Sequence, residues 1–501
     1  MKDKIMFKPT KEQATIVETA ETGCNIAVSA KAGAAKTTTC ILIAEALIQP
    51  SLYIAFNKSI AEEASGKFPE HVECRTMHSI AYRAIVTPGF RKKLNNFLDF
   101  GDIEKLKSWP VEGDIDLKIL VADIITKFCQ SASYNLISFI SENATAEMDL
   151  SLVIPICSEY WDKLTNDKNN VKMTHDVYLK LFQLSKPDLT THIRENFATK
   201  VIPYQTIYLD EAQDSNPVTL DIILNQKSQI ILVGDEYQSI YEWRGAVNAM
   251  QNLPNDFVHL HLTESFRFTQ DIADLATRLT KILGNTKQII GRGVKPTNFN
   301  EDSPQFTKAI IVRNNSTLLD YLLEAYDKDE KVYVVADLND LWSKLYHISA
   351  LMFNTEPKYP NKELAMFNTF KELTEAAQAV PELSKLLNLS KNLSQGAGLH
   401  TNISNIKKAI VSSPSEANYT LTTCHKAKGL EYDIVTLDDD LLPTDEEGTP
   451  LGGANLVAEL AKDQIGNLLY VAITRAKYKV YYPAQLQMLF AWLDADNKAS
   501  I

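Results

Sequence analysis

Short apolar runs alternate with helical patterns through the first half of the sequence. The runs lie at residues 24–30, 51–56, 205–210, 228–235 and 257–262, and two of them end in a carboxylate. After the first run, the segment TTCILIAEAL has the apolar spacing of a helix. Short β-rich runs separated by helices are typical of a parallel sheet that is covered on both faces. This part of the sequence therefore predicts an α/β domain.

The second half of the sequence repeats the pattern. Further strand-like runs lie at residues 308–313, 331–335, 419–423, 432–437 and 478–482. They are again rich in β-branched and aromatic residues, which favour strands. We therefore expect two α/β domains, each built on its own sheet.

Two stretches have no strand pattern and are expected to be helical insertions into the sheet domains. They also set the expected boundaries of the domains, because each sheet domain resumes after its insertion. We expect the last residues, DADNKASI, to be frayed. The predicted division is a first sheet domain at 1–79 and 201–268, its insertion at 80–200, a second sheet domain at 269–344 and 416–487, its insertion at 345–415, and a C-terminal tail at 488–501.

Composition narrows the class of protein. No apolar run approaches the roughly 20 residues of a membrane span, and the N-terminus MKDKIMFKPTKEQ has no apolar core of a secretory signal. We therefore expect a cytoplasmic protein without a membrane partner. The six cysteines form no CxxC pair, which argues against a zinc site or a disulfide framework and favours reduced, mostly buried thiols.

The net charge of −12 argues weakly against nucleic-acid binding, because phosphate attraction requires positive surface. A narrow channel that holds a few nucleotides depends on local cations more than on the total charge. The acidic excess does predict modest non-specific affinity for duplex DNA.

A candidate phosphate loop lies at residues 30–37, AKAGAAKT, between a strand and a helix. Backbone N–H groups of Ala32, Gly33, Ala34, Ala35 and the first helical residues, Thr38 included, are expected to bind phosphate oxygens. The usual pattern is GxxxxGK[ST], and here Ala30 and Ala35 replace both glycines. By itself AxxxxAKT leaves two interpretations open, a phosphate loop or a small-residue turn before an ordinary helix.

The segment LDEAQD at residues 209–214 ends an apolar strand. In a phosphate-binding site, Lys36 would reach the β- and γ-phosphates, and Thr37 with Asp210 would bind Mg²⁺. Glu211 would polarise the attacking water as general base. An isolated DExxD is more often a solvated acidic loop, but the strand before it and the lysine loop upstream favour the catalytic interpretation.

Residues 233–246, VGDEYQSIYEWRGA, resemble motif III of the UvrD/PcrA/Rep helicases. The rest of the chain then resembles this family in order. Similarity to the Q motif and to motifs Ia, Ib, IV, V and VI is found at 10–13 (TKEQ), 55–59 (AFNKS), 76–79 (TMHS), 262–267 (LTESFR), 423–433 (TCHKAKGLEYD) and 467–477 (NLLYVAITRAK).

The resemblance spans residues 7 to about 482, with the two insertions poorly matched. FNKSIAEEA, TMHSIAY and NLLYVAITRAK are most similar to the F-box DNA helicase branch of the family. No F-box precedes the Q motif, so we expect a relative from a prokaryote or from a phage-infected host cell.

The resemblance implies two RecA-like P-loop domains with ATP and Mg²⁺ between them. Gln13 would read the adenine edge, and Gln238 would sense the γ-phosphate. Arg267 and Arg475 would act as arginine fingers. Phe266 would stack on the adenine and Glu431 would bind the ribose. The expected catalytic set is Lys36, Glu211, Gln238, Arg267 and Arg475. Each arginine taken alone is more often a surface salt-bridge residue.

DNA binding is expected to combine stacking with phosphate contacts. The stacking candidates are Phe56, Tyr241 and Trp243, of which Trp243 has a core position as its main alternative. The polar candidates are Asn57, Lys58, His78, Arg244 and His425. We expect single-stranded DNA and junctions of single- and double-stranded DNA as partners.

The predicted function is an ATP-dependent DNA helicase or translocase that moves 3′→5′ on single-stranded DNA, for unwinding or protein displacement in replication, recombination or repair. Two alternatives stay open. The first is a weakly hydrolysing, ATP-dependent DNA clamp, suggested by Ala35. The second is the motor subunit of a nuclease or defence complex, with 345–415 as the surface for a protein partner.

Overall fold

The computed structural model divides into two compact units, residues 1–262 and 263–501, and each unit is described by itself. The α/β fold class with parallel sheets is confirmed in both. The predicted domain and insertion boundaries stay predictions. The residues that the structure describes are 8–110, 115–195, 198–241, 245, 248–250, 253–361, 363–365, 367–378, 380–445, 447–462 and 464–499.

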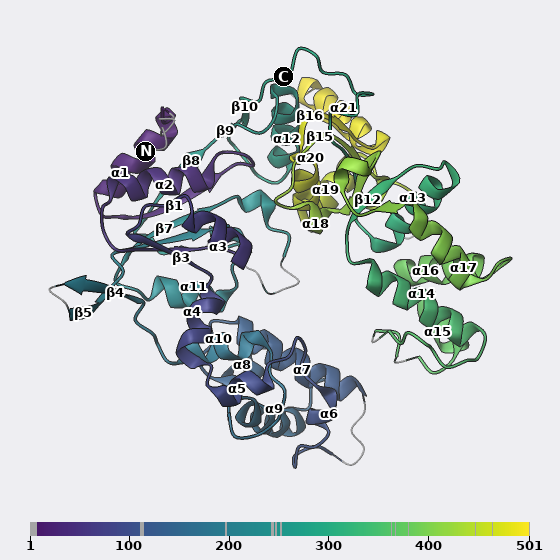
Figure 1. Cartoon of the computed structure of the whole chain (residues 1–501), viewed down its shortest axis with the longest axis horizontal. Coiled ribbons are helices and arrows are strands. Elements are labelled where there is room, and N and C mark those ends of the chain that lie inside the picture. Colours follow the sequence, from purple (N-terminus) through teal and green to yellow (C-terminus); the bar gives the residue numbers. More distant parts are fainter. Residues whose placement is uncertain are drawn as a thin grey trace. The chain divides into compact units, whose positions relative to one another are not determined.

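The first unit contains a six-stranded sheet in the order β3-β2-β6-β7-β1-β8, and every neighbouring pair is parallel (Figure 1). All the strands predicted for this half are present. The strands are β1 (Asn25–Ala30), β2 (Ser51–Ile54), β3 (Val72–Arg75), β6 (Thr206–Asp210), β7 (Gln229–Gly234) and β8 (Phe257–Leu262).

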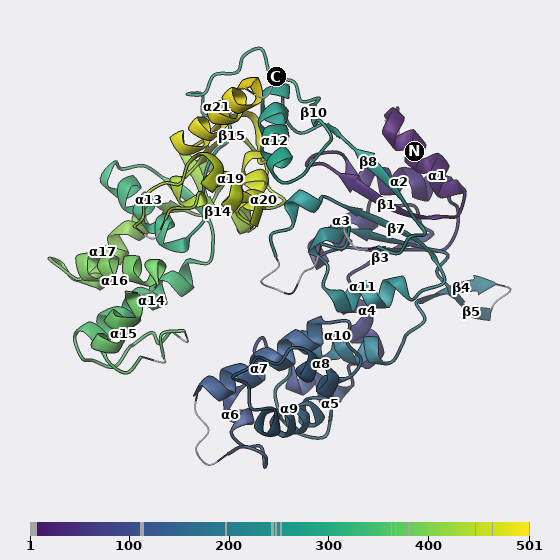
Figure 2. The same ribbon diagram turned by 180° about the vertical axis from the view of Figure 1, so that it is seen from behind.

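Both faces of this sheet are buried. Successive residues of β1 point to opposite faces, so Ala27 belongs to one apolar cluster and Ile26 with Val28 to another. Helices α1, α2 and α3 cover the second cluster, and α4 with α11 cover the first (Figures 1 and 2). These helices are α1 (Lys11–Glu21), α2 (Lys36–Ala46), α3 (Lys58–Ser65), α4 (Met77–Ile85) and α11 (Pro217–Leu224).

The segment after α4 is helical, as predicted, and its core is continuous with the sheet's first cluster. Phe128 and Tyr160, both buried, lie in the same cluster as the sheet residue Ala27. The helices are α5 (Pro88–Lys93), α6 (Phe100–Ile103), α7 (Ile115–Gln130), α8 (Leu136–Glu142), α9 (Leu150–Leu164) and α10 (His175–Leu184).

The expectation of helix as far as residue 200 is wrong at its end. An antiparallel hairpin, β4 (Thr190–Glu195) and β5 (Ala198–Pro203), leads back to the sheet. Strand β3 was also missed, because it is four residues long and carries Glu73 and Arg75. Such a short, charged segment gives almost no hydrophobic periodicity.

The second unit has a six-stranded parallel sheet in the order β13-β12-β14-β11-β15-β16. All the strands predicted for this half are present, and the two-residue β13 is additional. The strands are β11 (Lys308–Val312), β12 (Val332–Val335), β13 (Ile410–Val411), β14 (Tyr419–Thr423), β15 (Tyr432–Leu437) and β16 (Ala476–Tyr481).

One face of this sheet shares a core with helices α13 to α17, since β11, β12 and β14 contribute Val312, Val332 and Leu421 to it. A further pair of short strands, β9 (Glu264–Ser265) and β10 (Ile290–Gly291), precedes the sheet. The helices of the unit are α12 (Gln270–Ile282), α13 (Asn315–Asp327), α14 (Leu338–Met352), α15 (Phe370–Ala377), α16 (Pro381–Leu393), α17 (Leu399–Ile406), α18 (Cys424–Ala427), α19 (Gly453–Lys462), α20 (Ile465–Ile473) and α21 (Ala484–Ala499).

Helix α21 continues to Ala499 and so includes most of the segment DADNKASI that was expected to be frayed. All six thiols are free, and five of them are buried, as predicted. In the part of the chain that the structure describes, each helix is too short or too polar to cross a bilayer.

Candidate functional site

The predicted site residues of the first unit gather at one edge of its sheet. Because neighbouring strands are parallel, the loops that follow them leave from the same edge, where α/β proteins bind their ligands. The candidate phosphate loop follows β1, and the DEAQD segment begins at the last residue of β6. The loops after β2, β3 and β7 begin at the same edge and carry Phe56, His78 and Gln238.

The loop after β1 makes a tight turn that directs the N-terminus of α2 toward this edge. Gly33 has φ 72°, and Ala35 is left-handed at φ 58° and ψ 43°. The turn is closed by a hydrogen bond from the Ala34 N–H to the Lys31 carbonyl, 3.0 Å long. Helix α2 then begins at Lys36. A helix N-terminus presents backbone N–H groups and a partial positive charge, so this end of α2 fits a phosphate group.

The alanine at position 35 explains how the loop departs from the usual pattern. The left-handed conformation is the one that glycine adopts without strain, and an L-residue adopts it at a cost of about 1–2 kcal/mol. Ala35 has that conformation here, so the chain follows the glycine path with a side chain in place. Ala35 therefore has, with a methyl group, the backbone conformation that glycine would adopt at this position.

Two side-chain contacts join the loop to the DEAQD segment. Lys36 Nζ lies 3.0 Å from Glu211 Oε1. The Thr37 hydroxyl donates to Asp210 Oδ2 over 3.1 Å. Tyr53 of β2 donates its hydroxyl to the same Asp210 oxygen, and the Glu211 N–H donates to Asp210 Oδ1 over 2.9 Å. The structure thus brings the four predicted residues together and adds Tyr53, which the sequence did not indicate.

The charges of this cluster depend on one another. Burial lowers the pKa of Lys36, but the charges of Glu211, Asp210 and Asp235 raise it more, so its pKa lies above the ordinary value. Burial and then the charge of Glu211 raise the pKa of Asp210, against the lowering effect of Lys36. One lysine is therefore held among several carboxylates, and a further cation would reduce their mutual repulsion.

The donor set fits Mg²⁺. The ion prefers oxygen ligands and commonly takes one or two from the protein, with water and phosphate oxygens completing the shell. The Thr37 hydroxyl and the Asp210 carboxylate are oxygen donors in direct contact at the end of β6. Among the described residues no group of three His, Cys, Asp or Glu could hold a metal ion.

The two predicted glutamines lie on either side of this cluster. Gln13 is fixed by a capping box with Thr10 and donates its amide to Thr39 Oγ1 of α2 over 3.1 Å. Gln238 follows β7 and donates to Asp235 Oδ2 over 2.6 Å. Both side chains are buried. Gln213 connects the segment that carries Gln238 to Glu211, because its amide contacts both Asp235 and Glu211. Gln213 lies within DEAQD, but the sequence did not indicate a role for it.

Two aromatic residues predicted to stack on DNA lie side by side. The rings of Phe56 and Tyr241 have centroids 5.7 Å apart and planes 16° apart. Phe56 is 42% exposed. Both line a cleft of ≈ 430 Å³ that also contains His78 and Asp210. The cleft therefore joins the predicted DNA contacts to a predicted Mg²⁺ ligand within one unit.

The polar DNA candidates differ in their surroundings. The Asn57 side chain accepts from the Ile60 N–H and caps α3, a structural use that the sequence did not reveal. Lys58 has a side chain that is 89% exposed and lies 3.5 Å from Glu62. His78 Nε2 lies 3.3 Å from Asp176 of α10. The predictions for Trp243 and Arg244 fall outside the described residues.

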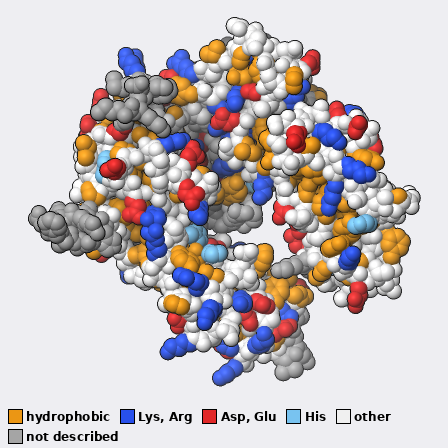
Figure 3. Space-filling view, viewed as in Figure 1, with side chains coloured by type: hydrophobic (Ala, Val, Ile, Leu, Met, Phe, Trp, Pro, Cys, Tyr) orange, Lys and Arg blue, Asp and Glu red, His pale blue; other side chains and the backbone are white. Residues whose placement is uncertain are grey.

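Local charge is uneven on the surface. Lys and Arg side chains project from the region of α5 to α10, at the bottom of the view, among Asp and Glu (Figure 3). The total charge of −12 therefore does not describe each face of the molecule.

In the second unit, three of the predicted nucleotide residues lie together. Arg267 Nε donates to Glu431 Oε1 over 2.6 Å, and its Nη1 donates to the Thr474 carbonyl over 3.2 Å. Arg475 is 1% exposed and donates to the carbonyls of Val471 at 2.9 Å and Leu430 at 3.3 Å. Both arginines therefore contact the segments that carry Glu431 and Thr474.

Two other predicted residues of this unit have different surroundings. Phe266, next to Arg267 in the chain, has a side chain that is 49% exposed. His425 follows the carboxyl end of β14, whereas Glu431 and Arg475 precede the amino ends of β15 and β16. In a parallel sheet these are opposite edges.

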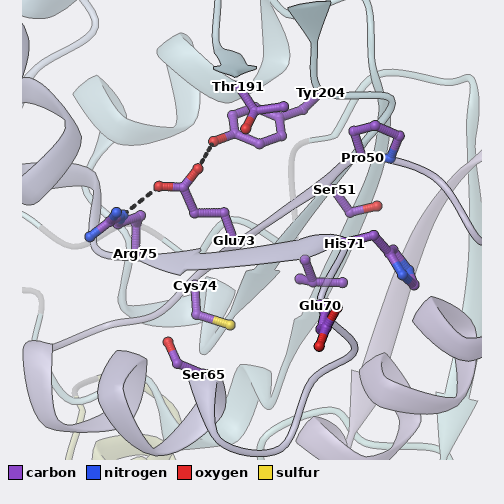
Figure 4. A pocket seen from close by; sticks show the side chains of 11 residues that line it. Pro50, Ser51, Ser65, Glu70, His71, Glu73, Cys74, Arg75, Thr191 and Tyr204 are labelled. Carbon is purple, nitrogen blue, oxygen red and sulfur yellow. Dashed lines mark hydrogen bonds and ion pairs between the residues drawn. The ribbon is translucent and has the colours of Figure 1, made fainter. Parts of the chain in front are cut away.

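A separate cavity of ≈ 500 Å³ lies beside the edge strand β3 (Figure 4). Glu73 lies in it and accepts hydrogen bonds from Arg75 Nε at 2.7 Å and from the Tyr204 hydroxyl at 2.6 Å. The cavity contains none of the predicted site residues. Its residues Glu73 and Arg75 pair with each other, and we assign no chemistry to the cavity.

A parallel sheet with a lysine loop after one strand and paired carboxylates after another defines the class of P-loop proteins with RecA-like sheets. The sequence matches the family described as UvrD/REP helicase N-terminal domain over residues 9–258. It also matches the family described as UvrD-like helicase C-terminal domain over residues 165–485. The chain belongs to the UvrD-like helicase family.

Relatives agree with this assignment. The chain is 27% identical over 523 residues to F-box DNA helicase 1 of Gallus gallus, with 97% of this chain and 50% of the relative covered. It is 28% identical over 526 residues to F-box DNA helicase protein 1 of Schizosaccharomyces pombe, with 96% and 58% covered. A segment of 103 residues, 19% of this chain and 13% of the relative, is 34% identical to DNA helicase II of Escherichia coli. The chain thus spans about half the length of the two F-box relatives.

Proposed function

We propose that the chain is a superfamily 1 motor that hydrolyses ATP with Mg²⁺ and moves 3′→5′ along single-stranded DNA, unwinding duplexes or displacing bound proteins. The observation that supports this most is the contact of Lys36 with Glu211 and of Thr37 with Asp210 at the sheet edge that also carries the Phe56–Tyr241 pair. A nucleotide site and a DNA-stacking site on one rigid edge are what a DNA-stimulated ATPase requires.

In this proposal Lys36 and the N-terminus of α2 bind the phosphates, and Gln13 recognises the adenine. Bound Mg²⁺ would neutralise phosphate charge and polarise the phosphoryl group. Thr37 and Asp210 would hold the ion. Glu211 would orient and deprotonate the attacking water, because its carboxylate lies next to the lysine that reaches the terminal phosphate.

We propose that Arg267 and Arg475 stabilise the charge that develops on the phosphates, with Glu431 on the ribose and Phe266 on the adenine. The guanidinium of Arg267 donates a hydrogen bond to the carboxylate of Glu431 in this structure. Its action on a phosphate requires it to exchange that carboxylate for another anion. Such exchange of ion-pair partners is a common switch in nucleotide-driven proteins.

The polarity and the activity have one direct test. A duplex with a 3′ single-stranded tail and a matched duplex with a 5′ tail are incubated with the protein, ATP and Mg²⁺, and strand separation is followed by fluorescence. We expect separation of the 3′-tailed duplex alone. Separation of the 5′-tailed duplex alone would contradict the proposed direction, and ATP hydrolysis that does not respond to single-stranded DNA would contradict the motor.

Phe56→Ala should weaken binding of single-stranded DNA. Stacking of one base on an aromatic ring contributes about 1–3 kcal/mol, which corresponds to roughly 5- to 150-fold in affinity. Phe56 is exposed and parallel to Tyr241, so its loss removes a stacking surface with little loss of core packing. The measurement is fluorescence anisotropy of a labelled oligonucleotide. Phe97, 60% exposed in the same unit, supplies the control Phe97→Ala, and equal affinities for the two variants would reject the assignment.

Ala35→Gly should keep or raise the rate of ATP hydrolysis. The glycine relieves the left-handed strain, about 1–2 kcal/mol, but adds flexibility to the unfolded chain worth about 0.4–1 kcal/mol. These terms oppose each other, so we expect the free energy of unfolding to change by about 1 kcal/mol or less. Phosphate release and urea denaturation check both parts. A large loss of hydrolysis would mean that the loop binds nucleotide along another backbone path.

One observation favours the second candidate, an ATP-dependent DNA clamp that hydrolyses weakly. Arg475 is 1% exposed and donates to backbone carbonyls of its own helix region. Arg475 therefore has to break these hydrogen bonds before its guanidinium can contact a phosphate. Hydrolysis that single-stranded DNA stimulates, and that Lys36→Ala abolishes, would exclude the clamp.

The wider setting of the motor stays a proposal. We propose a role in replication, recombination or repair, with residues 345–415 as the surface for a protein partner. An alternative is that the chain is the motor subunit of a nuclease or defence complex. A pull-down from the native host tests these predictions. The two relatives that match nearly the whole chain are eukaryotic, so they do not support the expected prokaryotic or phage setting.

A further inference from the structure

Gln213 is a buried residue with a hydrogen bond at each end of its amide. It lies in η1 (Ala212–Asp214) directly after Glu211 and is 0% exposed. Its Nε2 donates to Glu211 Oε2 over 2.7 Å. Its Oε1 accepts from the backbone N–H of Asp235 over 3.0 Å. The side chain thus joins the predicted general base to the first residue after β7.

The contact with Gln213 holds one of the two carboxylate oxygens of Glu211. The two oxygens have different partners, with Oε1 on Lys36 and Oε2 on Gln213. When Lys36 turns to a phosphate group, Gln213 still holds the other oxygen. The backbone of Glu211 is left-handed, at φ 51° and ψ 45°, which is unusual for a residue with a side chain. A left-handed backbone at a residue with a side chain is strained, so contacts with neighbouring residues have to stabilise it.

An independent observation is the space that Gly234 leaves for this amide. A Cβ at position 234 would lie 2.6 Å from Gln213 Oε1 and 3.2 Å from the Gln213 backbone nitrogen. The φ angle of Gly234 is not positive, so the backbone conformation does not require glycine at this position. The close contacts of a Cβ do require it. The end of β7 is therefore shaped to receive the side chain of Gln213.

The segment after β7 is attached to Gln213 at a second point. The Ser239 hydroxyl donates to the Gln213 carbonyl over 3.2 Å. Between these two attachments, Gln238 donates to Asp235 over 2.6 Å. Two residues beyond Ser239 is Tyr241, whose ring stacks with Phe56. A displacement of Tyr241 by a stacked base would therefore be transmitted to Gln213.

We propose that Gln213 is a positioning residue that orients Glu211 for hydrolysis and couples it to the DNA-contacting segment after β7. The inference rests on the proposed function, because it assigns Glu211 the role of general base. Gln213 itself need not touch ATP. Its action is through the geometry of Glu211.

The test uses Gln213→Glu, which keeps the size of the side chain. The variant replaces the N–H₂ donor with an oxygen that faces Glu211 Oε2 at 2.7 Å and Asp214 Oδ2 at 3.2 Å. Misplacing a reacting group by about 1 Å costs about 10²-fold in rate. At a pH high enough to ionise the new carboxyl, whose pKa is raised by burial and by the two neighbouring carboxylates, we expect kcat to fall by about that factor and the stimulation by single-stranded DNA to shrink. KM for ATP, and the affinity for a fluorescent ATP analogue, should change less than about threefold, because Lys36 and the phosphate loop are untouched.

A pH profile separates positioning from packing. When the new carboxyl is protonated, its O–H can again donate to Glu211, so the ratio of variant to wild-type kcat should rise as the pH falls. Gln213→Ala has no such donor at any pH, and its ratio should stay flat. Gly234→Ala should resemble Gln213→Ala, because the added Cβ displaces the amide.

Gln183 supplies the matched control. It is 1% exposed in the same unit, and its amide donates to the Ala132 carbonyl at 2.9 Å and to Asp221 at 2.8 Å. Gln183→Ala should lower the melting temperature but leave kcat and DNA stimulation unchanged. Retention of kcat within about threefold in Gln213→Glu, or a pH-independent ratio, would overturn the inference. A wild-type chain without DNA-stimulated hydrolysis would overturn the proposed function itself.

Discussion

Glu211→Gln should reduce the DNA-stimulated rate of ATP hydrolysis by about 10²–10⁴-fold, the usual contribution of a general base. The amide keeps the shape of the side chain but cannot accept the proton of the attacking water. Binding of ATP should be retained or improved, because the carboxylate that lies 3.0 Å from Lys36 no longer competes with phosphate for the lysine. The measurements are phosphate release in excess single-stranded DNA and titration with a fluorescent ATP analogue.

Glu236→Gln is the matched control for this prediction. Glu236 also follows a strand of the same sheet, and it lies 3.5 Å from Lys31 with a side chain that is 28% exposed, against 25% for Glu211. Its loss should change the rate by less than about threefold, since catalysis by a base requires a position next to the reacting water. Comparable losses for the two variants would show that charge at this edge, and not a base at Glu211, supports hydrolysis.

Arg267→Ala should lower kcat for ATP hydrolysis by about 10³–10⁵-fold, the range expected for an arginine that stabilises the transferred phosphoryl group. The side chain is 15% exposed and is held by Glu431 and by the Thr474 carbonyl. Its removal takes away a pre-oriented cation that acts only as charge develops. Binding of nucleotide to the phosphate loop of the first unit should persist. Single-turnover hydrolysis and analogue binding separate these effects.

Arg292→Ala controls for the loss of an ion pair in the same unit. Arg292 lies 2.8 Å from Glu264, as Arg267 lies 2.6 Å from Glu431, but its side chain is 51% exposed. We expect a near-normal rate for this variant, because exposed ion pairs contribute little to stability. If Arg267→Ala hydrolysed ATP as fast as Arg292→Ala, Arg267 would be a structural partner of Glu431.

Individual residues show how far the sequence pattern reaches. Lys36, Thr37, Asp210 and Glu211 were identified from two short motifs, and the structure places them in contact. Tyr53 could not be identified from the sequence, because it looks like an ordinary core aromatic of a strand. Its hydroxyl reaches Asp210, 157 residues away in the chain. Gln213 stood inside a motif, but nothing in its spacing indicated which groups its amide would meet.

The elements that were missed are those with weak local signals. Strand β3 has four residues with alternating burial, and β13 has two. The hairpin of β4 and β5 pairs only with itself. Hydrophobic periodicity needs several turns or alternations before it exceeds chance, so such elements depend on tertiary contacts.

By itself the sequence determined two parallel α/β units, most of the strands that build them, and the residue types of a phosphate site, because periodicity and motif spacing are local properties of the chain. The tertiary structure decided which residues meet. Strand β6 lies between β2 and β7 in the sheet, although β2 is far from it in the chain, and this order brings Tyr53, Asp210 and Gly234 into one place. Only that packing placed Gln213 between Glu211 and Asp235 and buried Arg475, since neighbours across a sheet leave no local trace in the sequence.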